Sequence, residues 1–207
     1  MAAPSALKTD YFSFLGLPRK LRIDMNDLEQ RYRALSRQYH PDYFYNAPPA
    51  ERRAALEKSS YLNDAYRALK NPISRIEYLL KVEGVLTSSG TFERDDFSRA
   101  SAPPAGLLEE VFALNEELDG IREARESGAS ANALKPRLER ARAPIEAKRQ
   151  EHEAQLEELS AKWDAVLDAG GASGHERRAI LAALHERFLE RNYINNLLAG
   201  IERELTG

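Results

Sequence analysis

The sequence predicts an all-α protein in which an N-terminal helical hairpin with flanking short helices precedes a C-terminal three-helix bundle. Three observations lead to this prediction. Apolar side chains in residues 24–39 recur at i, i+4, i+7 and i+11, namely at Leu28, Tyr32, Leu35 and Tyr39. From residue 107 onward the apolar spacing alternates between four and three, as in the seam of a helical bundle. Between these regions, glycine, serine and proline punctuate residues 83–106 and predict a connection between domains.

Two helices are expected before the hairpin turn. Asp10 precedes an aromatic segment at residues 11–15 that is followed by a Gly-x-Pro stop, so we predict a helix of one or two turns with Asp10 as its cap. Asp24 is expected to cap a second helix. Arg33 and Arg37 lie one turn apart on the face opposite its apolar stripe. Those two arginines form either an ordinary solvated face or a contact for a partner.

The helical pattern is interrupted at His40-Pro41-Asp42. A third helix begins at Pro48-Pro49, where proline is tolerated because the first amides of a helix have no internal acceptor. The tripeptide is therefore expected at the tip of a helical hairpin. Asn71-Pro72 ends the third helix and starts a fourth.

Three longer helices are predicted from Gly106 onward. The seam of the first consists of Leu107, Val111, Leu114, Leu118 and Ile121. The second continues the periodicity as far as Trp163, and Pro144 predicts a kink or break within it. After a glycine-rich turn, the third runs from about His175 to Leu205. We therefore divide the chain into a first domain at residues 1–82, a linker at 83–104 and a second domain at 105–207.

One row of residues lies outside the predicted seam of the first long helix. At 100° per residue, Leu108 and Phe112 project roughly 100° to 140° away from that seam, and Glu116 continues the same row. Phe188 on the last helix also lies toward the edge of its seam. The pattern leaves two interpretations open: these residues pack against the first domain or the connection, or they form a partner site.

The composition excludes several classes of chemistry. The chain has no cysteine, which excludes disulfides, thiolate-held iron–sulfur clusters and cysteine nucleophiles. Four scattered histidines form no obvious metal site, and the phosphate-binding loop and the hydrolase elbow are both missing. We therefore expect neither an enzyme nor a bound cofactor or metal. No apolar run approaches the roughly 18 residues that span a bilayer, and residues 1–8 contain no targeting signal, so we expect a cytoplasmic protein with no membrane partner.

Charge is distributed unevenly along the chain. The first 82 residues carry a net charge of +5 and the remaining residues −8, which suggests two halves that face different partners. A nucleic-acid-binding module that uses the basic half is one alternative. The charge is modest, however, and the aromatic residues there mostly belong to apolar stripes, so we expect no nucleic-acid partner.

Residues 10–82 resemble a J-domain, whose His-Pro-Asp loop stimulates ATP hydrolysis by DnaK-like chaperones. The matching residues are Asp10-Tyr11-Phe12, Leu15-Gly16-Leu17, Tyr39-His40-Pro41-Asp42, Phe44, Leu62-Asn63, Ala65-Tyr66, Leu69, Pro72, Arg75 and Glu77-Tyr78-Leu79-Leu80. The segment from Arg75 to Leu80, followed by an acidic three-helix tail, is similar to the HscB family of J-domain co-chaperones, which serve iron–sulfur cluster biogenesis.

This resemblance implies two partners and a set of contact residues for each. An HscA- or DnaK-like ATPase chaperone would contact the loop and the basic helix face, through His40, Pro41, Asp42, Arg33 and Arg37. An IscU-like iron–sulfur scaffold would bind the second domain, through Leu108, Phe112, Glu116 and Phe188. The missing cysteines are consistent with this division, because the scaffold would carry the cluster.

The sequence departs from the family at both contacts. Tyr43 stands where the family commonly has lysine, and Glu109 stands where a methionine is expected. Ala113 and Gly120 occupy positions that can be acidic, which weakens the electrostatic part of the scaffold contact. A J-protein for a different or general client is therefore the main alternative. Against a general role, the chain has neither a Gly/Phe-rich stretch nor paired Cys-x-x-Cys motifs.

Overall fold

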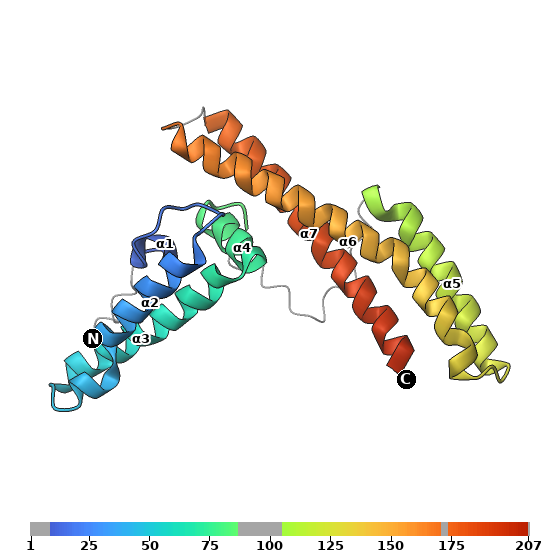
Figure 1. Cartoon of the computed structure of the whole chain (residues 1–207), viewed down its shortest axis with the longest axis horizontal. Coiled ribbons are helices and arrows are strands. Elements are labelled where there is room, and N and C mark those ends of the chain that lie inside the picture. The colour runs from blue at the N-terminus through green and yellow to red at the C-terminus, as the bar shows by residue number, and fades with distance from the viewer. Residues whose placement is uncertain (1–8, 87–104, 171–173, 207) are drawn as a thin grey trace. The chain divides into compact units, whose positions relative to one another are not determined.

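The computed structural model describes residues 9–86, 105–170 and 174–206, and the regular elements in these ranges are all helical (Figure 1). This confirms the all-α fold class predicted from the sequence. The chain divides into two compact units, Met1–Ser88 with Ser160–Ala182, and Ser89–Leu159 with Ala183–Gly207. Two long helices contribute residues to both units, α6 (Ala131–Asp168) and α7 (Gly174–Thr206).

The first two helices begin at the aspartates that the sequence predicts as caps. In α1 (Tyr11–Phe14), the Asp10 carboxylate accepts the N–H of Ser13 at 3.0 Å. In α2 (Met25–Tyr39), the Asp24 carboxylate accepts the N–H of Asn26 at 2.8 Å. Each carboxylate satisfies an amide of the first turn that has no acceptor within the helix, which is why aspartate starts a helix well.

The hairpin is formed by α2 and α3 (Pro49–Lys70), which lie side by side and are joined through the short 3-10 helix η1 (Pro41–Phe44) (Figure 1). The next helix, α4 (Pro72–Val82), starts after Asn71, whose side-chain oxygen accepts the N–H groups of Ile73 and Ser74. Both α3 and α4 have proline in the first turn, as the sequence predicts.

The core of the first unit combines side chains from all four of these helices. The fully buried members include Phe12, Leu28, Leu62, Leu69, Leu79 and Leu80. Aromatic contacts hold α1 in place, because Tyr11 stacks on Tyr78 with ring centroids 4.2 Å apart and the Tyr11 N–H donates to the Tyr78 hydroxyl at 2.8 Å. Burial raises the pKa of Tyr78, so this hydroxyl keeps its proton.

Arg75 is a buried cation on α4 that donates to three backbone carbonyls in two other segments of the chain. Its Nε donates to the carbonyl of Leu69 at 2.6 Å, its Nη1 to that of Leu21, and its Nη2 to that of Lys70 at 3.4 Å. Burying a charge is costly unless it is hydrogen-bonded, and here three carbonyls meet that requirement. Arg75 therefore holds the end of α3 to the segment between α1 and α2.

The end of α6 anchors the same segment in the first unit. Asp164 is buried and accepts the N–H groups of Leu21 and Arg22 at 2.7 and 2.9 Å. The indole N–H of the adjacent Trp163 donates to the carbonyl of Arg19 at 2.8 Å. Three hydrogen bonds thus fix residues 19–22 to α6, a contact that no sequence pattern predicts.

The second unit packs η3 (Ala105–Leu107) and α5 (Leu108–Glu126) with parts of α6 and α7. Its core contains Leu107, Val111, Leu114 and Ile121 before the turn, and Leu134, Leu138, Ile145, Ile194 and Ile201 after it. The first four belong to the seam that the periodicity predicts. The break expected at Pro144 does not occur, since α6 continues through both Pro136 and Pro144. Pro144 is exposed, so water can hydrate the carbonyl that lacks its helical donor.

Within the described ranges, none of the helices combines the length and the apolar character needed to cross a bilayer. The domain boundaries at residues 82 and 104 stay predictions. Most of the expected linker, residues 87–104, lies outside the described residues.

Candidate functional site

His40, Pro41 and Asp42 form the turn that leads out of α2. The backbone leaves the helix at His40, with φ −63° and ψ 127°, and Pro41 then opens η1. The Asp42 N–H donates to Nδ1 of His40 at 3.4 Å, and the Tyr43 N–H donates to the His40 carbonyl at 3.1 Å. The proline ring restricts φ at the centre of the turn. The loop conformation is therefore largely set within the tripeptide and its neighbour.

The Asp42 carboxylate projects into solvent, with 85% of the side chain exposed against 50% for His40. Its Oδ2 lies 3.5 Å from Nδ1 of His40, and that nitrogen already accepts the Asp42 N–H. The carboxylate therefore keeps most of its capacity to accept hydrogen bonds from a partner.

The base of the loop is fixed, and one of the two predicted arginines is already paired. The Tyr39 ring contacts Phe14 at 6.2 Å between centroids. Arg33 donates to Glu29 at 2.5 Å, whereas Arg37 forms no ion pair among the residues that the structure describes. This pair was not predicted from the sequence, although the i, i+4 spacing of Glu29 and Arg33 is a recognised signal for it.

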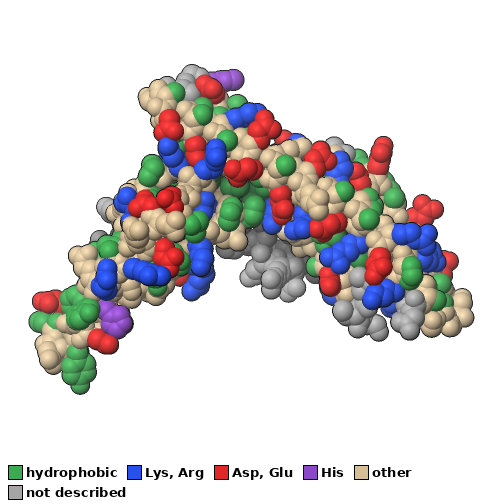
Figure 2. All heavy atoms as spheres, in the orientation of Figure 1, with side chains coloured by type: hydrophobic (Ala, Val, Ile, Leu, Met, Phe, Trp, Pro, Cys, Tyr) green, Lys and Arg blue, Asp and Glu red, His purple; other side chains and the backbone are tan. Residues whose placement is uncertain are grey.

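Aromatic side chains flank the loop. Tyr43 and Tyr45 are 73% and 78% exposed, and Figure 2 shows hydrophobic side chains at this end of the hairpin. The rings of His40 and Tyr43 meet edge to face, with centroids 6.0 Å apart. Tyr43 occupies the position where the resemblance leads one to expect lysine, so this end of the hairpin offers apolar surface in place of a positive charge.

Leu108, Phe112 and Glu116 form an exposed row on α5, which we call the α5 row. Phe112 is 69% exposed and Leu108 37%, while Val111 and Leu114 on the other side of the helix are buried. The structure therefore exposes the apolar residues that the periodicity places outside the seam. Large apolar side chains that gather on one exposed face are typical of a binding surface.

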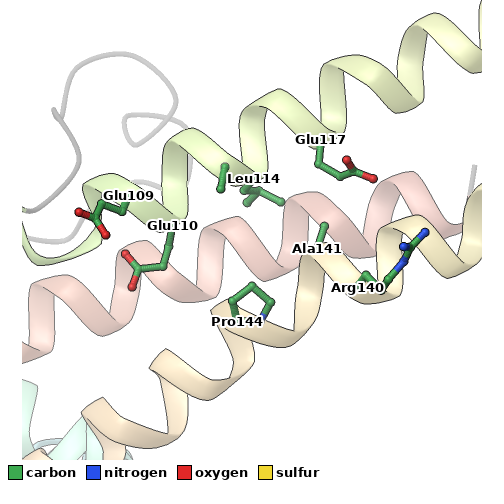
Figure 3. Close-up of a pocket in the computed structure, with 8 residues that line it drawn as sticks. Glu109, Glu110, Leu114, Glu117, Arg140, Ala141 and Pro144 are labelled. Carbon is green, nitrogen blue, oxygen red and sulfur yellow. The ribbon is translucent and has the colours of Figure 1, made fainter.

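A groove of 460 Å³ borders α5 on the side that faces α6 (Figure 3). Three glutamates line it from α5. Glu117 accepts a hydrogen bond from Arg137 at 2.8 Å, which holds the pKa of Glu117 below its usual value, and Glu110 lies 3.5 Å from Lys148. Glu109 forms no ion pair with any of the described residues. The negative charge beside the α5 row is thus largely that of Glu109 and Glu116.

Phe188 does not share this exposed surface. It is expected from the sequence beside Leu108 and Phe112, but Phe188 is only 4% exposed. It follows the fully buried Leu184 by one helical turn, so it continues the buried stripe of α7. In this structure Phe188 is a core residue, and a partner could contact it only after the helices move.

A buried polar group in the second unit stands apart from both candidate contacts. Nδ1 of His152 lies 3.3 Å from Oε2 of Glu190 but makes no hydrogen bond among the described residues, and Arg187 pairs with Glu190 at 2.5 Å. Burial lowers the pKa of His152, and the charge of Glu190 opposes that shift. In the described part of the chain, no three His, Cys, Asp or Glu side chains come together as a metal site would require.

Comparisons with known proteins agree with this architecture. The DnaJ domain family matches residues 10–78, which cover α1 to most of α4. Chaperone HscB from Vibrio cholerae shares the fold at 24% identity and a TM-score of 0.57, over 94% of this chain and 96% of that one. Human co-chaperone protein HscB is 25% identical with a TM-score of 0.58, over 99% of this chain and 85% of that one.

The DnaJ match covers the hairpin that carries the His40 loop, and the structural likeness extends through the long helices that carry the α5 row. Both solved relatives are described as chaperone or co-chaperone proteins. The chain therefore contains a DnaJ domain at residues 10–78, and over most of its length it shares the fold of these two HscB proteins.

Proposed function

We propose that this protein stimulates the ATPase of an HscA- or DnaK-like chaperone through the His40 loop and delivers to it an IscU-like iron–sulfur scaffold bound at the α5 row. The observation that carries the proposal is the exposed Asp42 carboxylate at the turn of a DnaJ-type hairpin, in a chain whose fold is similar to that of HscB proteins.

The loop can act on a chaperone through hydrogen bonding alone. An exposed carboxylate makes charge-assisted bonds to an arginine or to backbone amides, and these are stronger than bonds between neutral groups. Arg37 is free to attract an acidic surface, while Glu29 neutralises much of the charge of Arg33. The chain itself performs no chemistry in this mechanism, because the loop shifts the conformational population of the ATPase.

The α5 row suits a partly apolar client contact. Phe112 and Leu108 supply exposed apolar area, and Glu116 with Glu109 supplies negative charge. Aromatic anchors of this kind carry much of the energy in protein interfaces. Because the chain lacks cysteine, the cluster would stay on the scaffold, and this protein would raise the effective concentration of scaffold near the ATPase.

The chaperone contact is tested by single-turnover ATP hydrolysis with the cognate chaperone. His40→Gln and Asp42→Asn should each lose most of the stimulation because they remove the contact at the loop. Glu57→Gln, an exposed carboxylate on α3, is the matched control and should stimulate as well as wild type. Full stimulation by either loop variant would show that the loop assignment is wrong.

The client contact is tested by calorimetric titration with an iron–sulfur scaffold protein. Truncating a contact residue costs about 1 to 2 kcal/mol, so Leu108→Ala with Phe112→Ala should weaken binding by at least several-fold. Leu56→Ala is the matched control, because Leu56 is an exposed apolar residue on α3. If the double variant keeps its helical circular dichroism and its affinity, the α5 row is not the client surface.

A further inference from the structure

A second pocket lies on the hairpin, between α2 and the C-terminal end of α3. It has a volume of 660 Å³, and we call it the α2–α3 pocket. Its apolar wall is formed by Tyr32 and Tyr66, whose rings stack with centroids 4.2 Å apart. Its polar lining consists of Asn63, Arg67, Lys70 and Asn71. Helical spacing explains the grouping, since positions 63, 66, 67 and 70 share one face of α3.

The hydrogen bonds inside the pocket leave donors without acceptors. The Tyr32 hydroxyl donates to Oδ1 of Asn63 at 2.9 Å. Oδ1 of Asn71 accepts the N–H groups of Ile73 and Ser74 at 2.9 and 3.1 Å. Oδ1 of Asn71 therefore has both lone pairs occupied and Oδ1 of Asn63 has one, whereas the two Nδ2 groups have no acceptor among the described residues. Asn71 can therefore offer a ligand only its N–H donors, while Asn63 offers N–H donors and one remaining lone pair.

The charges of the pocket are also uncompensated. Neither Arg67 nor Lys70 forms an ion pair with a described carboxylate, and Nζ of Lys70 lies over the Tyr66 ring at 5.4 Å from its centroid. The helix dipole favours basic residues in the last turn of α3. The helix dipole does not explain why the Nδ2 groups of Asn63 and Asn71, which line the same pocket, also lack acceptors. The pocket thus presents positive charge and N–H groups beside an aromatic wall.

We propose that the α2–α3 pocket binds an acidic segment of a partner polypeptide. A carboxylate of that segment lies between Arg67, Lys70 and the two asparagine amides, and its aliphatic stem or an apolar neighbour packs on Tyr32 and Tyr66. The aromatic wall favours a polypeptide over a small inorganic anion, which would use only the donors. The four polar lining residues are exposed, so the pocket is an open surface site that a polypeptide segment can reach.

This pocket is separate from the His40 loop. At a rise of about 1.5 Å per residue, positions 63–70 lie roughly 20 to 30 Å along α3 from its start at Pro49, next to the loop. A partner can therefore occupy the pocket whether or not the loop stimulates an ATPase. An experiment that refutes peptide binding at the α2–α3 pocket would therefore not refute the proposed role of the His40 loop, and the reverse also holds.

The test is a titration of the full-length, ¹⁵N-labelled chain followed by NMR. The probes are acetyl-Asp-Leu-Glu-Glu-Leu-amide, the same peptide with Asn and Gln in place of the acids, and inorganic phosphate. We expect the acidic peptide alone to shift the amide signals of residues 63, 66, 67, 70 and 71. Arg67→Gln with Lys70→Gln should weaken its binding at least tenfold.

The matched control is Arg52→Gln with Arg53→Gln, which removes two exposed arginines at the other end of α3 and should leave the affinity unchanged. An equal loss in this control would show that attraction is non-specific, and equal binding of the neutral peptide would remove the role of charge. Phosphate binding as tight as that of the peptide would identify a small-anion site instead. Each of these results, or the lack of any shift, overturns the proposal.

Discussion

Replacing Asp164 should release the segment between α1 and α2 from α6. This carboxylate is buried and accepts two backbone N–H groups, at 2.7 Å from Leu21 and 2.9 Å from Arg22. Burial raises the pKa of Asp164, and the two N–H bonds oppose that rise. In Asp164→Ala both donors lose their acceptor, and the Leu21 bond is the more buried of the two.

The magnitude follows from those two bonds. A hydrogen bond to a charged group contributes about 1.5 to 3 kcal/mol, and a buried donor left without a partner costs about 1 to 3 kcal/mol. Since water will hydrate the more accessible Arg22 N–H, we expect a local loss of about 2 to 4 kcal/mol. At 1.4 kcal/mol for each factor of ten, that loss corresponds to a roughly 30- to 700-fold larger equilibrium constant for opening of the segment, and to faster amide exchange by the same factor.

The assay is native-state hydrogen exchange measured by NMR at the Leu21 and Arg22 amides. Asp168→Asn provides the control, because Asp168 lies one turn further along α6 and pairs at the surface with Lys20 at 2.5 Å. Exposed ion pairs of this kind contribute about 0 to 1 kcal/mol, so exchange at residues 21 and 22 should change by less than about fivefold.

Unchanged protection of both amides in Asp164→Ala would refute the reasoning. So would equal acceleration in Asp168→Asn, because the segment would then be held by surface charge and the buried hydrogen bonds would contribute little.

Three further predictions concern stability, each measured by urea unfolding followed by circular dichroism. Arg75→Lys should lower the free energy of unfolding by about 1.5 to 3 kcal/mol, because an ammonium cannot reach the separate carbonyls that the guanidinium fork reaches; a loss under about 0.5 kcal/mol would contradict this. Gly16→Ala should cost about 1 to 2 kcal/mol, since Gly16 has φ +67° and an added Cβ would lie 2.8 Å from Nη1 of Arg31; unchanged stability would be inconsistent with that backbone. Burial lowers the pKa of His152 below its usual value of 6.5. As the pH falls through this range, the unfolded state therefore binds more protons than the folded state. The free energy of unfolding decreases as a result. His152→Gln should therefore lose less stability than wild type between about pH 7.5 and about pH 5.5, and equal losses would exclude His152 as the cause.

Local signals predicted much of the fold. The caps of α1 and α2, the prolines that open α3 and α4, and the seam of α5 all depend on residues within one or two helical turns of each other. For the same reason the periodicity predicted that Leu108 and Phe112 point away from the α5 core, and both are exposed. Their role as scaffold contacts remains a proposal.

Other features depend on neighbours that are distant in the sequence. The position of Pro144 on an exposed side of α6 decides that the helix continues through it. The ion pair between Arg33 and Glu29, in contrast, is a local contact. Because the two residues are four positions apart on one helix, the pair could have been predicted from the sequence. The burial of Phe188 was predicted wrongly although its signal is local, because Phe188 follows the buried Leu184 by one helical turn.

The sequence by itself determined the helical class, the order of the helices, the hairpin that presents His40-Pro41-Asp42 and the apolar row on α5, because helical period, capping and proline act over a few residues. Only the tertiary structure decided that Asp164 and Trp163 hold a segment more than a hundred positions earlier in the chain, and that Tyr32 meets Tyr66 beside unused amide donors. Such contacts arise where separate elements pack together, and a buried polar group is satisfied by whichever partner that packing brings within hydrogen-bond distance.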